Sequence, residues 1–297
     1  RMVDDVNAGQ RVFYDFHTDA DKRADPTLQH TGLFFLRGKP GAPFAVIAPG
    51  GGFAYVGSVH EGFPYAAEIS QQGLNAFVLK YRAGQGGRVA TQDLAAALGY
   101  IFQHARSLQL DTTGYSLWGS SAGARMAASI GSHGTAAFGG PALPKPVVVV
   151  MAYTGHSEVT ASEPATYVVV GERDGIAPPA AMEARIAALR RIGTRLAYRQ
   201  VPGLGHGFGT GQQQGPKELL RRRSQGGNQH QQRHHGQILK QQHAHHTLAV
   251  LALQLQSAAI ILMTMAVLLM AIAPDKASAV CHSIFHKLGA KVARNKD

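Results

Sequence analysis

Short apolar runs alternate with longer segments of helical periodicity along the first 209 residues of the chain. The runs are rich in β-branched and aromatic residues, which favour strands. The run at 147–150 consists of four valines, and a continuous apolar run of this kind predicts a strand buried on both faces of a sheet. We predict strands at 11–16, 33–36, 44–48, 76–81, 115–118, 147–153, 167–171 and 196–201.

The segments between these runs repeat their apolar residues with the period of an α-helix. In one of them, Met182, Ile186 and Leu189 fall on a single helical face. We predict helices at about 61–72, 90–108, 122–131 and 178–193. Strands separated by helices of this length form βαβ units. The pattern therefore predicts an α/β fold with a mostly parallel central sheet and helices on both faces, in one domain over residues 1–209.

The pattern changes after Gly209. Residues 210–246 are rich in Gln, His and Arg and hold few apolar residues, which predicts a disordered segment. Residues 247–297 contain an almost wholly apolar stretch at 248–273, long enough for a membrane-spanning helix, followed by a basic end. Three interpretations of this region stay open: a membrane anchor on a flexible linker, a buried or amphipathic helix, or a non-native stretch such as a shifted reading frame.

The positive net charge of +11 belongs mainly to the C-terminal third. Residues 1–209 hold 18 Lys and Arg against 15 Asp and Glu, whereas residues 210–297 hold 11 against 3. The first 209 residues therefore give no reason to expect a nucleic-acid partner. Cys281 is the single cysteine, which excludes an intrachain disulfide and fits a reducing compartment. We expect a cytoplasmic location for residues 1–209, with attachment to a membrane through 248–273 as the alternative.

Metal binding is not expected. Six histidines between positions 230 and 246 lack regular ligand spacing and have no companion Cys or Asp, so a solvated tract is the better interpretation.

The sequence GSSAG at 119–123 fits the pattern G-x-S-x-G, with Ser121 at its centre. This pattern places a serine on a sharp turn between a strand and a helix, and small neighbours let the turn pack. A predicted strand ends at Trp118 and a predicted helix begins at Ala122, so the context fits. We predict that Ser121 is a nucleophile and that Ser120 is a small turn residue.

A nucleophilic serine needs a base and an acid that orients the base. Asp174 follows the predicted strand 167–171, and His206 follows the predicted strand 196–201. The carboxyl ends of parallel strands open on one edge of a sheet, so these residues can meet Ser121 there. Glu172, two residues from Asp174, is the competing candidate for the acid.

Three consecutive glycines follow the predicted strand 44–48. Without side chains, their backbone N–H groups can turn towards one point. We predict that the N–H groups of Gly51, Gly52 and Ala122 form an oxyanion hole. The glycine patterns of nucleotide-binding loops are not present here, and no metal or organic cofactor is predicted.

Together these features resemble a known family. The motifs are PGGGF at 49–53, YR at 81–82, GSSAG at 119–123, GERDG at 171–175 and GHGFG at 205–209. They are similar to those of α/β-hydrolase-fold serine esterases and lipases, in the bacterial group related to hormone-sensitive lipase and acetyl-xylan-type esterases. The resemblance implies Ser121 as nucleophile, His206 as base and Asp174 as its partner, with Gly51, Gly52 and Ala122 as oxyanion donors.

The chain departs from that group in two places. Pro49 stands where many relatives have a histidine before the glycines. Relatives also usually continue after the histidine loop with an amphipathic helix that packs on the sheet, and the Gln-rich residues after Gly209 do not have this pattern.

The spacing between Ser121 and Asp174 bears on the substrate. The predicted strands 147–153 and 167–171 occupy much of this interval, so little chain remains for a lid domain. A minimal lid favours short acyl groups, such as acetyl, on small-molecule or carbohydrate esters. The first hypothesis is therefore a carboxylic-ester hydrolase. The alternatives are a serine peptidase of the prolyl-oligopeptidase type and a non-catalytic, hydrolase-like binding protein.

Overall fold

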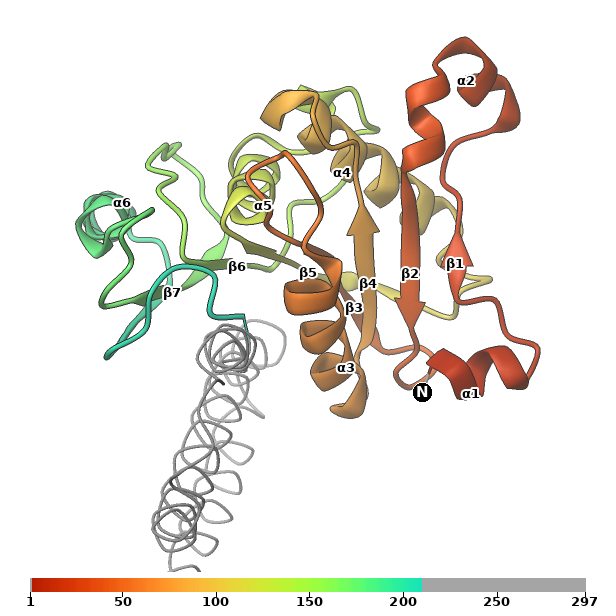
Figure 1. Cartoon of the computed structure of the whole chain (residues 1–297), viewed down its shortest axis with the longest axis horizontal. Coiled ribbons are helices and arrows are strands. Elements are labelled where there is room, and N and C mark those ends of the chain that lie inside the picture. The colour runs from red at the N-terminus through yellow and green to blue at the C-terminus, as the bar shows by residue number, and fades with distance from the viewer. Residues whose placement is uncertain (1, 210–297) are drawn as a thin grey trace, which may run out of the picture.

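The computed structural model describes residues 2–209. In this range eight strands form one sheet in the order β1-β2-β4-β3-β5-β6-β7-β8 (Figure 1). β2 is antiparallel to both β1 and β4, and all other neighbours are parallel. The predicted α/β class with a mostly parallel sheet is thus confirmed. The strands are β1 (Phe13–Tyr14), β2 (Gly32–Leu36), β3 (Pro43–Ala48), β4 (Asn75–Lys80), β5 (Asp111–Ser120), β6 (Val148–Ala152), β7 (Ala165–Gly171) and β8 (Leu196–Val201).

Helices cover both faces of the sheet within the described residues (Figure 1). They are α1 (Met2–Asn7), α2 (Asp19–Ala24), α3 (Phe63–Gln71), α4 (Gly86–Gln103), α5 (Ala122–His133) and α6 (Pro179–Arg191). Single helical turns lie at Pro26–His30, Ser58–Gly62 and Ala136–Phe138.

Alternate side chains of the central strands point to opposite faces, because successive residues of a strand alternate in direction. In β3, Phe44 and Val46 belong to the core cluster that contains residues of α4, α5 and α6. Ala45 and Ile47 belong to the second cluster, which contains residues of α3. All five residues of β6 are buried, as the run of valines predicts. The sheet therefore lies between two apolar layers.

The predicted strands and helices are present, with shifted ends. β1 has only two residues, and β5 begins at Asp111, four residues before its predicted start. The first part of β5 is polar, so its apolar pattern does not reveal it, but Asp111 pairs with Pro43 of β3. The helices α1 and α2 were not predicted, because each is short and buries no residue.

The predictions for residues 210–246 and 247–297, including the apolar stretch 248–273, lie outside the described residues. Among the helices of residues 2–209, none combines the length and the apolar character needed to cross a bilayer.

A buried ion pair joins α6 to the connection between β6 and β7. Arg185 of α6 donates from Nη2 to Oε2 of Glu163 at 3.2 Å, and both side chains are 1% exposed. The Glu163 carboxylate also accepts from the hydroxyl of Ser132 at 2.8 Å and the backbone N–H of Thr160 at 2.7 Å. Burial, followed by the charge of Arg185, lowers the pKa of the nearby His156 to about 4. His156 is therefore neutral in the folded protein near neutral pH.

This lowered pKa predicts a loss of stability in mild acid. In the unfolded chain His156 takes up a proton below about pH 6.5, but in the folded protein it stays neutral until about pH 4. Acidification through this window therefore favours unfolding, by on the order of 1–3 kcal/mol. We expect His156→Gln, which cannot take up a proton, to lose less stability than the wild type between pH 7 and pH 4.5 in urea unfolding. Parallel losses in the two proteins would contradict this assignment.

Candidate active site

Ser121 lies on a strained turn between β5 and α5. Its backbone φ is +50° and ψ is −114°, a conformation that residues with a side chain rarely adopt. Its backbone N–H donates to the carbonyl of Ala152 at the end of β6, at 2.8 Å. The turn also places Ser121 directly before the N-terminus of α5, where the helix dipole favours negative charge. Ser120, expected to be a small turn residue, is instead the last residue of β5, and its side chain is fully buried.

Two glycines make this turn possible because backbone atoms lie where a Cβ would be. A Cβ on Gly123 would overlap the carbonyl of Ala48 in β3, and one on Gly119 would overlap the carbonyl of Gly123. The start of α5 therefore packs directly on the end of β3. The small residues of the G-x-S-x-G pattern are required by this close approach.

The structure brings Ser121, His206 and Asp174 into one hydrogen-bonded chain. His206 Nε2 lies 2.9 Å from Ser121 Oγ. On the other side of the ring, His206 Nδ1 lies 3.0 and 2.9 Å from the two carboxylate oxygens of Asp174. A carboxylate can only accept, so the ring carries its hydrogen on Nδ1, and Nε2 is left to accept the Ser121 hydroxyl proton. This is the tautomer that a general base requires.

Asp174 is held in place by the chain that follows β7. Its side chain is fully buried, and Oδ1 accepts from the backbone N–H groups of Ile176 at 2.9 Å and Ala177 at 2.8 Å. The competing acid, Glu172, points elsewhere and accepts from the N–H of Gly203 at 2.7 Å. Asp174 is thus the carboxylate that orients His206.

The glycine loop, residues 49–57 between β3 and the helical turn at Ser58–Gly62, lies beside Ser121. A Cβ on Gly50 would lie 3.1 Å from the Cβ of Ser121. Gly51 and Gly52 both have positive φ, at 128° and 61°. Within residues 2–209, the N–H groups of Gly51, Gly52 and Ala122 donate to no protein acceptor. The donors predicted for an oxyanion hole are therefore unpaired in this part of the chain.

Tyr81 and Arg82, the YR motif, hold the loops around the glycines. The hydroxyl of Tyr81 donates towards the carbonyls of Pro49 at 3.0 Å and Gly50 at 3.3 Å. Burial raises the pKa of Tyr81, so the hydroxyl keeps its proton for these bonds.

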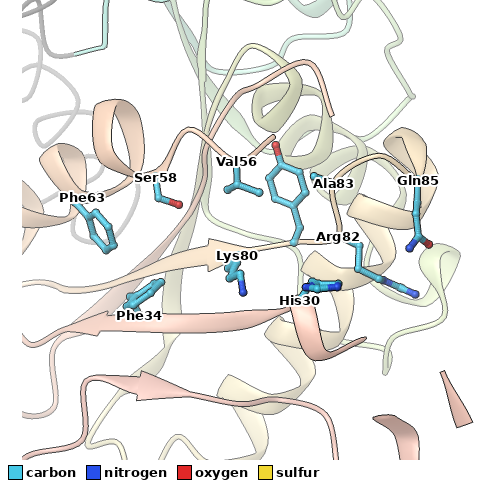
Figure 2. A pocket seen from close by; sticks show the side chains of 10 residues that line it. His30, Phe34, Val56, Ser58, Phe63, Lys80, Arg82, Ala83 and Gln85 are labelled. Atoms are coloured by element: carbon cyan, nitrogen blue, oxygen red, sulfur yellow. The ribbon is translucent and has the colours of Figure 1, made fainter. Parts of the chain in front are cut away.

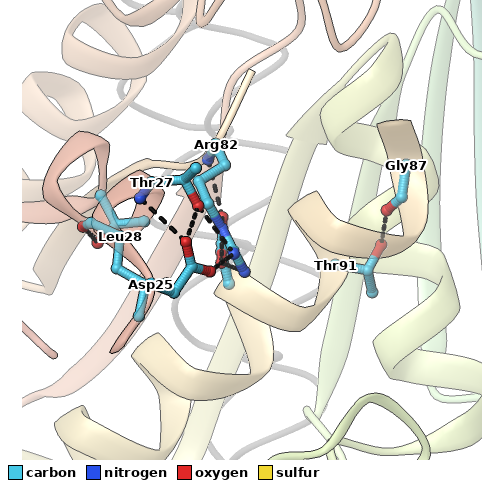
Figure 3. A network of polar contacts seen from close by, with 8 residues as sticks. Asp25, Thr27, Leu28, Arg82, Gly87 and Thr91 are labelled. Carbon is cyan, nitrogen blue, oxygen red and sulfur yellow. Dashed lines mark hydrogen bonds and ion pairs between the residues drawn. The ribbon is translucent and has the colours of Figure 1, made fainter. Parts of the chain in front are cut away.

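Arg82 ties the end of β4 to two other segments. Its guanidinium donates to Asp93 of α4 at 2.7 Å and to Asp25 at 2.9 Å, and Asp25 in turn accepts from Thr27 (Figure 3). This network fixes the chain directly after Tyr81.

Comparison with known proteins supports this architecture. The family model described as BD-FAE matches residues 37–147, fewer than half of the 297 residues. A comparison with curated proteins finds no match to this chain.

Several solved structures share the fold at low sequence identity. One is an acetyl ester-xyloside bifunctional hydrolase from Caldicellulosiruptor lactoaceticus, with a TM-score of 0.59 and 17% identity over 71% of this chain and 93% of that one. Another is MGS-M1, an alpha/beta hydrolase enzyme from a Medee basin deep-sea metagenome library. Its TM-score is 0.55, with 22% identity over 61% of this chain and 80% of that one. The chain has the α/β-hydrolase fold.

A third similar structure is a thermophilic esterase of the Planctomycetes species Thermogutta terrifontis, bound to propionate. Its TM-score is 0.54, with 18% identity over 65% of this chain and 87% of that one. The same esterase has been solved with butyrate bound and after phosphonylation by cyclosarin.

Two residues of this hydrolase-fold site were missed in the sequence. Glu61 lies in the single turn before α3, and Tyr153 directly follows β6. Both side chains are buried next to the site loops. Glu61 is one acidic residue near the start of a predicted helix, where acidic residues are common for other reasons, so no local signal separates it.

A pocket of about 470 Å³ lies next to the glycine loop (Figure 2). It is lined by Val56 of the loop, by Ser58 of the helical turn that follows and by side chains from β2 and β4, including Phe34 and Lys80. Neither Ser121 nor His206 lines it. Within residues 2–209, no group of three or more His, Cys, Asp or Glu side chains is arranged to hold a metal ion.

The close approach at Gly123 predicts a large cost of substitution. Gly123→Ala forces a methyl group against the backbone of β3, so we expect it to lower the free energy of unfolding by about 1–3 kcal/mol. The control is Gly155→Ala, where a Cβ meets nothing within 4 Å, and which should stay within about 0.5 kcal/mol of the wild type. Urea unfolding of the full chain measures both. Equal effects of the two substitutions would refute the close packing of this turn.

Proposed function

We propose that this protein is a serine hydrolase that cleaves carboxylic esters with short acyl groups. The observation that carries the proposal is the hydrogen-bonded chain from Ser121 through His206 to Asp174 on a strained strand-to-helix turn. The similar solved structures, several of them esterases, support the same reaction class.

In the first half-reaction, Ser121 Oγ attacks the carbonyl carbon of the ester while His206 Nε2 takes its proton. The carbonyl oxygen becomes an oxyanion, for which the N–H groups of Gly51, Gly52 and Ala122 are the donors. Loss of one such donor costs about 3–4 kcal/mol of transition-state stabilisation in a comparable hydrolase. His206 then returns the proton to the departing alcohol, and the acyl group stays on Ser121.

In the second half-reaction, water attacks the acyl-enzyme and His206 Nε2 takes a proton from it. Collapse of the second tetrahedral intermediate transfers that proton to Ser121 Oγ and releases the carboxylic acid. The buried carboxylate of Asp174 keeps the imidazole in its orientation and stabilises the imidazolium in both steps.

The connection between β6 and β7 supports short acyl groups. It spans residues 153–164 and contains no helix. Glu163 of this connection accepts from Ser132 of α5 and, within the connection, from the N–H of Thr160. A connection of this length gives no lid domain at this position to enclose a long acyl chain. Acetyl esters, on small molecules or carbohydrates, are therefore the proposed substrates.

The role of Ser121 is tested by hydrolysis of p-nitrophenyl acetate with the full chain. Ser121→Ala should lower kcat/KM by at least about a thousand-fold, because nothing else can form the acyl-enzyme. Ser107→Ala, at an exposed serine, is the control and should keep wild-type activity. A fluorophosphonate probe should label Ser121 in the wild type, as read by mass spectrometry. Activity that survives in Ser121→Ala, or a clear preference for a prolyl anilide, would overturn the proposal.

The acyl preference is tested with p-nitrophenyl esters of increasing chain length. We expect kcat/KM to fall by about tenfold or more between the acetate and the octanoate, equivalent to at least about 1.4 kcal/mol of transition-state binding. An equal or higher value for the octanoate would show that long acyl chains are bound.

A further inference from the structure

Glu61 is a buried carboxylate with two different partners. It is 7% exposed. Its Oε2 accepts the backbone N–H of Gly50 at 2.5 Å, and its Oε1 accepts the hydroxyl of Tyr153 at 2.9 Å. Each oxygen is therefore bonded to a different loop of the site. Burying an ionisable carboxylate costs free energy, whereas an apolar residue here would avoid that cost.

Tyr153 links Glu61 to the loop of His206 by contacting both. Its backbone φ is +38°, and its side chain is fully buried. Its hydroxyl, which donates to Glu61, accepts the backbone N–H of Gly209 at 3.2 Å. Its ring lies edge-on to the ring of His206, with 5.2 Å between the centroids. Tyr153 therefore touches the loop on both sides of Phe208. Its ring also lies edge-on to the Phe208 ring, with 4.6 Å between the centroids.

Gly50 lies between Glu61 and the nucleophile. A Cβ on Gly50 would lie 2.7 Å from Glu61 Oε2 and 3.1 Å from the Cβ of Ser121. The hydrogen bond from Gly50 to Glu61 fixes the peptide plane between Pro49 and Gly50, directly before the peptide that carries the Gly51 N–H. Glu61, through the Gly50 N–H, and Tyr81, through the Pro49 and Gly50 carbonyls, therefore hold the chain directly before the proposed oxyanion donors.

The ionisable groups that interact electrostatically with Glu61 come from five segments. They are His60 in its own turn, Tyr65 of α3, Tyr81 after β4, Tyr153 after β6 and His206 after β8. Burial raises the pKa of Tyr65 to about 12 and also raises those of Tyr81 and Tyr153, so these three phenols stay neutral. Burial also raises the pKa of Glu61, and its hydrogen bonds with Gly50 and Tyr153 oppose that change.

We propose that Glu61 is a positioning residue of the hydrolase site. As an anion it holds the glycine loop through Gly50 and the loop of His206 through Tyr153. Its charge also favours the His206 imidazolium formed during the reaction. This inference rests on the proposed ester hydrolysis. It assigns to Glu61 a role that acts through other groups, because the carboxylate contacts neither the Ser121 hydroxyl nor the His206 nitrogens.

The test compares Glu61→Ala, Glu61→Gln and Glu68→Gln in the full chain, with p-nitrophenyl acetate as substrate. Glu68 lies in α3, the helix that follows the turn of Glu61, and serves as the matched control. We expect Glu61→Ala to lower kcat about a hundred-fold with KM changed less than about threefold, because the loops hold the transition state rather than the substrate. Glu61→Gln keeps an acceptor for the Gly50 N–H, so it should recover at least about tenfold of the lost kcat. Glu68→Gln should match the wild type.

The pH profile separates a charge from a merely structural contact. Without the anion the imidazolium of His206 is less favoured, so the acid limb of kcat/KM in Glu61→Gln should move to lower pH by about half a unit. A second link is tested by Tyr153→Phe, whose effect on kcat should not add to that of Glu61→Ala in the double variant.

The outcomes separate this inference from the proposed function. A wild type that neither cleaves the ester nor labels at Ser121 rejects the hydrolase and the inference together. An active wild type with Glu61→Ala within about threefold of its kcat rejects the inference alone. If Glu61→Ala does not fold, Glu61→Gln decides: an unchanged acid limb together with a wild-type kcat overturns the role of Glu61.

Discussion

The contact between the start of α5 and the end of β3 is the constraint on which the rest of this site depends. Gly123 packs against the carbonyl of Ala48, so α5 begins immediately beyond the sheet edge. Ser121 must then turn with positive φ, which leaves its hydroxyl projecting from the strand-to-helix corner. The stored strain is offset by the packing of α5 on β5 and β6 and by the hydrogen bond from Ser121 to Ala152.

Around this corner the protein buries polar groups, although apolar side chains would be buried at a lower cost in free energy. Tyr81 holds the glycine loop by its carbonyls, whereas Glu61 holds the same loop by the N–H of Gly50. Tyr153 extends the second contact to the histidine loop. Apolar packing is not directional and tolerates small shifts, whereas hydrogen bonds specify the orientation of a peptide plane. The proposed oxyanion hole, which needs N–H groups that point at one position, benefits from that direction.

Much of the fold was predictable because parallel sheets have a strong local signature. The valines of β6 and the helical period of α6 are visible in any short window, and strand ends with Asp174 and His206 share an edge by topology. The polar start of β5 was missed because it is set by pairing with β3, and the short helices α1 and α2 were missed because neither buries an apolar residue.

The sequence by itself predicted the strands, the helices with an apolar face, their order and the roles proposed for Ser121, Asp174 and His206, since period, glycine spacing and strand-end position are local properties. Tertiary structure alone decided that Asp174 rather than Glu172 meets His206, and that Glu61 meets Gly50 and Tyr153. Residues 61 and 153 lie 92 positions apart in the sequence, in the turn before α3 and directly after β6, so only the folded chain brings them into contact. Two residues of the same charge on one short loop, such as Glu172 and Asp174, differ only in direction, which the packed chain sets.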